Sequence, residues 1–333
     1  GDIMSHINSP AVVGAGLMGK AISKHYSDQG HEVVLIEENL SQIEIASSEL
    51  AQQNITISND LNLLRDRDFI IEAVFEDLTA KKLVLKQISD FAKDDALIAT
   101  NTSSLLIKDL IGAVTIPSRF IGVHYNNPAD FNPIVEIIRD EQTDSATAKG
   151  VAEWVEKSGK YPVLCSDTPC FILNRQSLPF INEAARCLNF ASPGEIDFVA
   201  RQKVGVKLGP FEVMNLVGLD VMKSASRNLE ILGKGYASSV DLQKMREKRW
   251  AIDTVTGVDR EVSTEIIKRL RGAMLYPGKD ILDRKLCNEK DLDKICKLAL
   301  GYEKSSSEWL EILDESIIDQ LINSFLSFQS DLS

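Results

Sequence analysis

The sequence predicts an α/β protein in which a doubly wound, largely parallel sheet occupies the N-terminal half and an all-α region follows it. Three observations lead to this prediction. Short apolar segments alternate with amphipathic segments of helical length as far as residue 164, which is the pattern of strands joined by crossover helices. A glycine-rich turn, residues 14–19, follows the first apolar segment and opens the first helical one. From Phe171 onward the apolar residues recur with helical spacing, so no further strands are expected.

The elements of the N-terminal half can be placed from their apolar residues and turn residues. Residues 69–74, for example, form a continuous apolar run that is typical of a strand buried between helix layers. The expected strands are residues 10–14, 31–36, 55–57, 69–74, 96–100, 120–123, 134–138 and 161–164. The expected helices are residues 17–29, 40–53, 78–91, 105–111 and 145–159. Residues 167–169 interrupt the alternation, so the predicted domains are residues 6–167 and 168–333.

The C-terminal half carries a weak internal repeat. Residues 195–197 with Gly205 recur as residues 291–293 with Gly301, and a long helical segment precedes each copy. We therefore predict a first helical unit at residues 168–250 and a degenerate second unit at residues 260–333. The expected helices are residues 171–188, 193–202, 211–218, 219–232, 239–248 and 265–275 continuing past Pro277, with further helices in residues 308–328.

Size and composition exclude several classes of protein. A chain of 333 residues exceeds the usual size of one core, which favours two domains. The net charge of −12 argues against a nucleic-acid-binding protein and against a protein of anionic membrane surfaces. No apolar run reaches membrane-spanning length and no secretory signal is visible. The five cysteines include no CxxC pair and no histidine at zinc-ligand spacing, so we expect thiols in a reducing cytoplasm and no metal site.

The glycine turn is typical of dinucleotide-binding, Rossmann-like domains. Gly14 permits a tight turn out of the strand, Gly16 allows close approach of the backbone to a pyrophosphate, and Gly19 allows the helix to pack on the sheet. Leu17 and Met18 open that helix, whose N-terminus offers N–H groups to the phosphates. Three glycines at this spacing also occur in ordinary loops, so the flanking strand and helix carry the interpretation.

Glu37 adds a second indication of a nucleotide site. It ends the second predicted strand, 18 residues after Gly19, where an acidic side chain accepts hydrogen bonds from the adenosine ribose. The same carboxylate would repel a 2′-phosphate, and no arginine follows it directly. The sequence therefore predicts NAD rather than NADP as the cofactor.

Further motifs resemble those of the 3-hydroxyacyl-CoA dehydrogenases over nearly the whole chain. In order, they are residues 13–19, residues 72–76 with Lys81, residues 101–104, residues 122–128, residues 133–136 and residues 167–175. The resemblance implies an NAD-dependent oxidoreductase that interconverts a 3-hydroxyacyl thioester and its 3-oxoacyl form in fatty acid metabolism. It also implies that residues 6–167 bind NAD and that residues 168–333 serve in substrate binding and oligomerisation.

The chemistry of this reaction requires a base for the hydroxyl proton, and histidine titrates near working pH. His124 and Glu136 lie on neighbouring predicted strands, where the carboxylate could orient the imidazole. A carboxylate flanked by Val135 and Ile137 also needs a partner if it is buried. The resemblance implies the same catalytic pair.

By the same resemblance, Ser103 and Asn174 hold the substrate hydroxyl or carbonyl, while Glu76, Lys81 and Asn127 contact the nicotinamide-ribose half of NAD. Each residue also has a structural interpretation. His124 could be a structural residue at a strand end. Ser103 and Asn174 could cap helices, and Lys81 could belong to a solvated helix face.

Three departures from the family pattern bear on the substrate. Many members carry a long helical hairpin after the second strand that helps to hold CoA, whereas about thirty residues separate Asn39 from Phe69 here. Tyr125-Asn126 replaces the usual aromatic pair after the histidine, and Cys170 replaces a glycine, which suggests an altered pocket. Residues 250–257 replace a glycine-rich, aromatic segment.

Two alternatives follow from these departures. The substrate could be a 3-hydroxy acid that is free or bound to an acyl carrier protein, or the chain could be a catalytically idle NAD-binding scaffold. We also expect either a monomer or a homodimer. The second helical unit would favour a monomer if it covers the face that a partner covers in short family members, and sedimentation as a tight dimer through these helices would contradict that hypothesis.

Overall fold

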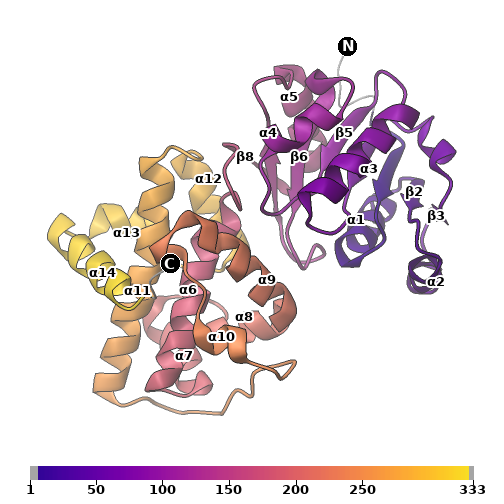
Figure 1. Ribbon diagram of the computed structural model, residues 1–333. Coiled ribbons are helices and arrows are strands. Elements are labelled where there is room, and N and C mark those ends of the chain that lie inside the picture. The colour runs from indigo at the N-terminus through magenta and orange to yellow at the C-terminus, as the bar shows by residue number, and fades with distance from the viewer. Residues whose placement is uncertain (1–6, 330–333) are drawn as a thin grey trace. The chain divides into compact units, whose positions relative to one another are not determined.

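The computed structural model describes residues 7–329 (Figure 1). Residue 6 and residues 330–333, at the ends of the two predicted domains, lie outside the described residues. The chain divides into two compact units, Gly1–Thr168 and Pro169–Ser333. The first is built on a sheet and the second from helices, so the predicted fold class is confirmed.

The first unit contains one eight-stranded sheet with the order β3-β2-β1-β4-β5-β6-β7-β8. The strands are β1 (Pro10–Val13), β2 (Val33–Ile36), β3 (Ile55–Ser58), β4 (Phe69–Glu72), β5 (Leu97–Thr100), β6 (Phe120–Tyr125), β7 (Ile134–Ile138) and β8 (Tyr161–Cys165). The first six strands in this order are parallel, β7 is antiparallel to β6, and β8 is parallel to β7. The reversal at β7 arises because residues 126–133 are too few for a helical crossover.

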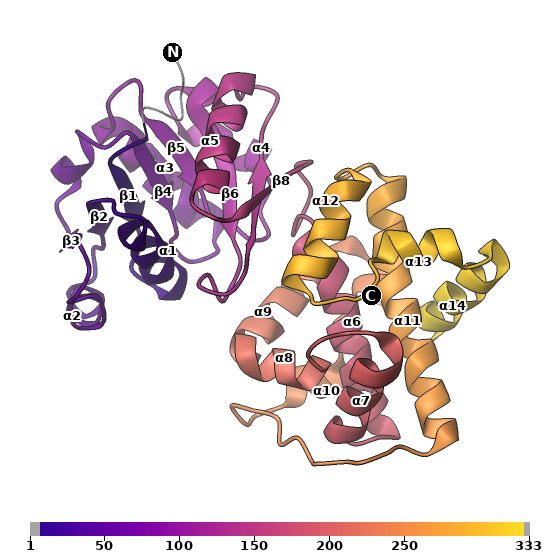
Figure 2. The same ribbon diagram turned by 180° about the vertical axis from the view of Figure 1, so that it is seen from behind.

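Helices connect the parallel strands on both faces of this sheet (Figures 1 and 2). They are α1 (Leu17–Asp28), α2 (Leu40–Glu49), α3 (Leu78–Phe91), α4 (Ile107–Leu110) and α5 (Ser145–Lys157). The chain moves from β1 through α1 to β2 on one side, and from β4 through α3 to β5 on the other. Because such crossovers are right-handed, α1 and α3 cover opposite faces. The change of direction between β1 and β4 marks the crevice where doubly wound sheets bind ligands.

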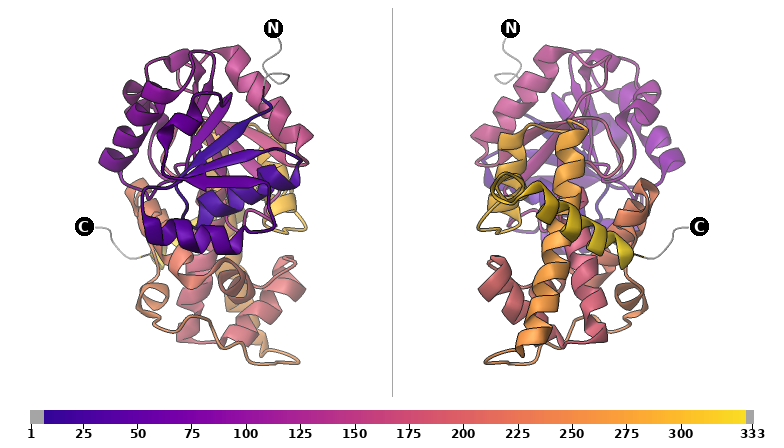
Figure 3. Two further views of the ribbon diagram at one scale, coloured as in Figure 1. Left: turned by 90° about the vertical axis from the view of Figure 1, so that its right-hand side faces the viewer. Right: turned by 90° about the vertical axis from the view of Figure 1, so that its left-hand side faces the viewer.

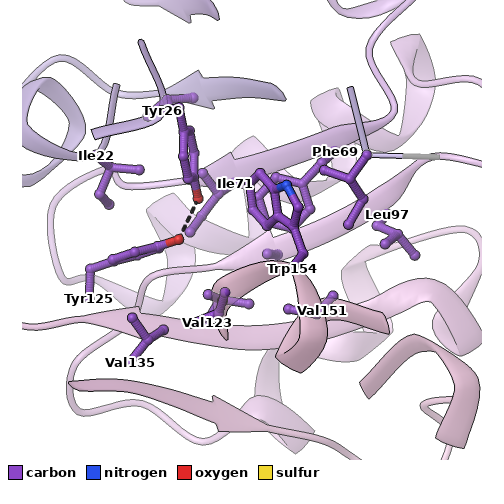
Figure 4. Close-up of a cluster of buried hydrophobic side chains, with 14 of the residues drawn as sticks. Ile22, Tyr26, Phe69, Ile71, Leu97, Val123, Tyr125, Val135, Val151 and Trp154 are labelled. Atoms are coloured by element: carbon purple, nitrogen blue, oxygen red, sulfur yellow. Dashed lines mark hydrogen bonds between the residues drawn. The ribbon is translucent and has the colours of Figure 1, made fainter. Parts of the chain in front are cut away.

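One face of the sheet is covered by an aromatic core (Figure 4). Tyr26 of α1 and Trp154 of α5 pack together with ring centroids 5.0 Å apart, and both rings contact Phe69 of β4. Tyr125 of β6 joins the cluster and its hydroxyl lies 2.9 Å from that of Tyr26. This core fixes the strands whose carboxyl ends carry the candidate site.

Two predicted boundaries were wrong near that site. The strand predicted at residues 120–123 continues to Tyr125, because His124 and Tyr125 pair with Glu136 and Val135 of β7. The helix predicted at residues 105–111 begins only at Ile107, where the Asp167 carboxylate accepts hydrogen bonds from the N–H groups of residues 107 and 108 at 2.8 and 2.9 Å.

The second unit consists of helices that pack around two long ones, α6 and α11 (Figure 3). The helices are α6 (Leu173–Arg186), α7 (Pro193–Val199), α8 (Pro210–Val217), α9 (Leu219–Leu229), α10 (Val240–Lys244), α11 (Arg260–Asp283), α12 (Glu289–Lys294), α13 (Ser306–Ile312) and α14 (Glu315–Ser327). The helix predicted over residues 239–248 ends early, at Lys244.

Three helices of this unit recur with a constant offset of 96 residues. Helices α7, α8 and α9 begin at residues 193, 210 and 219, and α12, α13 and α14 begin at residues 289, 306 and 315. Gly205 and Gly301 both adopt left-handed conformations. Reciprocal hydrogen bonds join the copies, from the Lys207 N–H to the Gly301 carbonyl at 3.0 Å and from the Glu303 N–H to the Gly205 carbonyl at 2.9 Å. The two copies are therefore paired about an approximate twofold axis.

Residues 7–329 contain no helix that is both long and apolar enough to cross a membrane. Within the same residues, no group of three or more His, Cys, Asp or Glu side chains could hold a metal ion. All five cysteines are thiols rather than disulfides.

Candidate active site

Of the three glycines of the turn, only Gly16 has room for an added Cβ atom. Gly14 has a φ of +108°, and a Cβ atom there would lie 2.8 Å from the Ala73 carbonyl oxygen. A Cβ atom at Gly19 would lie 1.7 Å from the Gly14 oxygen, so close packing requires glycine there. No atom lies within 4 Å of the corresponding point at Gly16. The turn is therefore packed tightly at its two ends and is open at Gly16, where a phosphate group could approach the backbone.

Glu37 lies beside this turn. Its Oε1 accepts a hydrogen bond from the Ala15 N–H at 2.9 Å, and its Oε2 accepts one from the Asn39 N–H at the same distance. Each carboxylate oxygen can accept a second hydrogen bond. These backbone hydrogen bonds hold the Glu37 carboxylate in place, and its oxygens can still accept hydrogen bonds from sugar hydroxyl groups. Of the predicted helix-opening residues, Leu17 is exposed and Met18 packs against the core.

A buried ion pair lies at the carboxyl end of β4, and the sequence interpretation missed one of its partners. Lys81 donates to both oxygens of Glu72, at 3.1 and 2.9 Å, and to the Val74 carbonyl at 2.9 Å. Lys81 is 2% exposed and Glu72 is fully buried, so the solvated interpretation of Lys81 was wrong. A carboxylate that ends the apolar strand at residues 69–72 was the available signal for Glu72.

Glu76 holds the loop that follows β5. Its Oε2 accepts hydrogen bonds from the N–H and hydroxyl groups of Ser103, at 2.7 and 2.6 Å, and from those of Ser104, at 2.9 and 3.1 Å. Its Oε1 accepts from the Thr102 hydroxyl at 2.8 Å. Burial alone would raise the pKa of Glu76, but the Lys81 charge and these hydrogen bonds outweigh it and hold the pKa below its usual value. Ser103 is not a helix cap, because α4 has Leu106 at its N-cap position and no side chain there accepts a hydrogen bond from the helix N–H groups.

His124 and Glu136 form a hydrogen-bonded pair. They face each other across the antiparallel ladder of β6 and β7, and His124 Nδ1 lies 2.9 Å from Glu136 Oε1. Glu136 is fully buried and His124 is 4% exposed. Asn126 also donates to Glu136 Oε1, at 3.3 Å. Donation of Nδ1–H to the carboxylate leaves the imidazole lone pair on Nε2, the state required of a general base.

The remaining predicted residues have different surroundings. Asn127 follows β6 and is half-buried. Asn174 is the second residue of α6 and belongs to the second unit, where it is half-buried. The suggestion that Tyr125 borders the substrate was wrong, because strand alternation directs its side chain into the aromatic core (Figure 4). Cys170 is buried in the second unit with a left-handed φ of 62°.

The chain matches two domain families in succession. Residues 9–54 and 41–168 match the family described as "3-hydroxyacyl-CoA dehydrogenase, NAD binding domain". Residues 171–254 match "3-hydroxyacyl-CoA dehydrogenase, C-terminal domain". These ranges end before α11, the first helix of the second helical copy.

Curated relatives and solved structures agree with these matches. The human mitochondrial hydroxyacyl-coenzyme A dehydrogenase is 32% identical over 66% of this chain and 78% of its own. A probable 3-hydroxybutyryl-CoA dehydrogenase of Deinococcus radiodurans is 32% identical over 70% of this chain and 92% of its own. A crystal structure of 3-hydroxybutyryl-CoA dehydrogenase from Escherichia coli has a TM-score of 0.79 at 21% identity, covering 96% of this chain and 94% of that one, and supports the fold alone.

Proposed function

This chain belongs to the 3-hydroxyacyl-CoA dehydrogenase family, and from that premise we propose that His124 is its acid–base group and that Glu136 orients it. The family's reaction is the NAD-dependent interconversion of 3-hydroxyacyl-CoA and 3-oxoacyl-CoA. The observation that carries the proposal is the buried hydrogen bond of 2.9 Å between His124 Nδ1 and Glu136 Oε1.

In the direction of oxidation, His124 Nε2 removes the proton of the 3-hydroxyl group. The Glu136 carboxylate stabilises the imidazolium that forms, and in the reverse direction the imidazolium returns the proton to the 3-oxo oxygen. NAD, when bound, accepts the hydride from the carbon that carries the hydroxyl group. Ser103 and Asn174 position the substrate oxygen in this proposal.

The proposed cofactor site lies at the crevice between β1 and β4. Gly14, Gly16 and Gly19, with the N–H groups of Leu17 and Met18, hold the pyrophosphate, which the open space at Gly16 supports. Glu37 binds the adenosine ribose, and Glu76, Lys81 and Asn127 contact the nicotinamide-ribose half. In this proposal residues 6–167 form the NAD-binding domain. Residues 168–333 form the helical domain for substrate binding, which would also carry the oligomerisation contacts of a homodimer.

CoA is the proposed acyl carrier, in fatty acid metabolism in the cytoplasm. Only α2, β3 and one short 3-10 helix (Leu61–Leu64) lie between β2 and β4, so no long hairpin is present there to hold CoA. An acyl carrier protein or a free 3-hydroxy acid therefore remains the alternative. The pairing of the two helical copies within one chain supports a monomer over a homodimer.

A direct test follows NADH with acetoacetyl-CoA, acetoacetyl carrier protein, and free 3-hydroxybutyrate with NAD. We expect turnover with the CoA substrate, and a loss of about 10²- to 10⁴-fold in kcat for His124→Gln. His31→Gln is the matched control, because His31 lies outside the site and contacts the Asn8 carbonyl at 3.4 Å. NADH binding without turnover of any substrate would support the idle scaffold, and full activity of His124→Gln would exclude the proposed mechanism.

A further inference from the structure

Asn126 contacts the proposed catalytic pair from the loop that follows β6. It lies two residues after His124, immediately beyond the end of β6, and is 5% exposed. Its Nδ2 donates to Glu136 Oε1 at 3.3 Å, and the same oxygen accepts the His124 Nδ1–H at 2.9 Å. Two donors separated by two residues thus converge on one carboxylate oxygen.

The Glu136 carboxylate can rotate about its last side-chain bond, so each hydrogen bond that it accepts helps to set its orientation. Rotation of a glutamate carboxylate about its Cγ–Cδ bond is only weakly restricted by the side chain itself. The ladder pairing of His124 with Glu136 places the two residues opposite each other, but it does not select the angle of the carboxylate plane. A second donor on Oε1 restricts that angle. In a fully buried site such a hydrogen bond is also stronger than it would be in water.

We propose that Asn126 is a positioning residue of the His124–Glu136 pair: its amide fixes the rotation of the Glu136 carboxylate so that Oε1 stays on the imidazole Nδ1–H. The inference rests on the proposed function of that pair. Asn126 touches neither the substrate nor the reacting atoms in this role. It acts on the rate of the chemical step through the orientation of His124, and not on the affinity for substrate or cofactor.

The test is a pair of variants, Asn126→Leu and Asn126→Asp. Leucine has nearly the same size but no N–H group, whereas aspartate keeps the shape and places a second carboxylate against Glu136. Because a hydrogen bond to a charged group is commonly worth a factor of about ten or more, we expect kcat for acetoacetyl-CoA reduction to fall by about tenfold in Asn126→Leu and further in Asn126→Asp. KM for acetoacetyl-CoA and Kd for NADH should stay within about twofold of the parent.

Two readouts separate positioning from packing. The primary deuterium isotope effect with 4-deuterated NADH should rise in the variants, because the chemical step becomes slower. In proton NMR, the downfield resonance of the His124 Nδ1–H, identified by its absence in His124→Gln, should move or broaden in both variants. Asn182→Leu is the matched control: this buried asparagine of the second unit donates to Ser226 at 3.0 Å, and its loss should leave kcat and the resonance unchanged.

The results for the Asn126 variants either support or overturn the positioning role of Asn126. Parental kcat and an unmoved resonance in folded Asn126→Leu would overturn the inference, as would a change in KM alone, which would make Asn126 a lining residue of the substrate pocket. If Asn126→Leu does not fold, Asn126→Asp decides by the same measurements. Full activity of His124→Gln in the same assays would indicate failure of the proposed function instead, which keeps the two failures distinguishable.

Discussion

Both units of this protein bury charged side chains, but they place them differently. In the first unit, Glu72 and His124 lie at or near the carboxyl ends of β4 and β6, beside loops that leave the sheet. In the second unit, Glu183 lies inside α6 and accepts hydrogen bonds from Arg269 of α11, at 2.8 and 2.6 Å, and from Arg186 at 3.2 Å. The first arrangement places the charged groups at strand ends beside loops, and the second encloses them between the helices α6 and α11.

The difference shows how buried charge can serve two purposes in one chain. A strand end is a point where the backbone turns away, so a charged group there can meet a ligand. The middle of a helix offers only neighbouring helices, so a charged group there joins those helices together. Near the ends of the same helices, Arg175 and the half-buried Asp280 also link α6 to α11, at 3.0 Å. We therefore expect substitutions of buried charge to reduce activity in the first unit and stability in the second.

Glu183 should contribute strongly to stability and not to activity. In Glu183→Gln, Arg186 and Arg269 lose their shared anion inside the unit, and breaking a buried ion pair costs about 3–5 kcal/mol. Urea unfolding should show that loss, while kcat per folded molecule stays at the parental value. Asp283→Asn is the control, because it removes an exposed pair with Lys279 that is worth no more than about 0.5 kcal/mol. A lower kcat with unchanged stability would assign Glu183 to the catalytic site instead.

The sequence predicts the parts of this fold that depend on local patterns. Alternating apolar segments predict the sheet. The spacing of 18 residues from Gly19 predicts that Glu37 lies near the glycine turn, and in the structure its carboxylate accepts a hydrogen bond from the Ala15 N–H. The reversal of β7 depends on pairing between strands, which local periodicity does not encode. The sequence shows that the repeat has a glycine at residues 205 and 301. It does not show the reciprocal backbone hydrogen bonds that join the two copies there.

A site residue can be predicted from the sequence where its own neighbours in the chain indicate its role. A glutamate among apolar neighbours predicts that Glu136 has a partner, and His124 lies opposite it. Glu72 carries the same signal, and residues 72–76 with Lys81 form one of the family motifs, but the motif does not show that these two side chains pair with each other. Lys81 looked like a solvated residue because a helix-face pattern does not show that a strand end lies beneath it. The role of Glu76 in holding Ser103 also depends on a loop contact that sequence spacing does not reveal.

A second, smaller effect concerns Asp197, a buried carboxylate between α7 and α8. Burial raises its pKa to about 7, against the opposing hydrogen bonds from the N–H groups of Phe211 and Glu212, at 2.9 and 3.1 Å. The folded pKa lies above the unfolded value of about 3.9. Protonation of Asp197 therefore favours the folded state. Its contribution to the free energy of unfolding is complete below about pH 4, and about 2–4 kcal/mol is lost as the pH rises through 7.

Urea unfolding of the parent and of Asp197→Asn at pH 5 and pH 8 measures this effect. The parent should lose more stability between the two values than the variant does, because asparagine does not titrate. Ser239→Ala, which removes the N-cap of α10, should lower stability by about 1 kcal/mol equally at both values. Parallel pH dependence of the parent and of Asp197→Asn would show that this carboxyl is ionised throughout the range.

Gly16 of the first unit is a position where a substitution should change cofactor binding and leave stability almost unchanged. The structure leaves no atom within 4 Å of a Cβ at Gly16, so Gly16→Ala should change the free energy of unfolding by no more than about 0.5 kcal/mol. The added methyl group would occupy the space proposed for the pyrophosphate and weaken NADH binding by about tenfold, which is about 1.4 kcal/mol. Fluorescence titration with NADH measures the affinity. Gly19→Ala is the counterpart, because its Cβ would lie 1.7 Å from the Gly14 oxygen and should reduce both binding and stability. Parental affinity in Gly16→Ala would place the pyrophosphate away from this turn, and the open position would then be a feature of the fold alone.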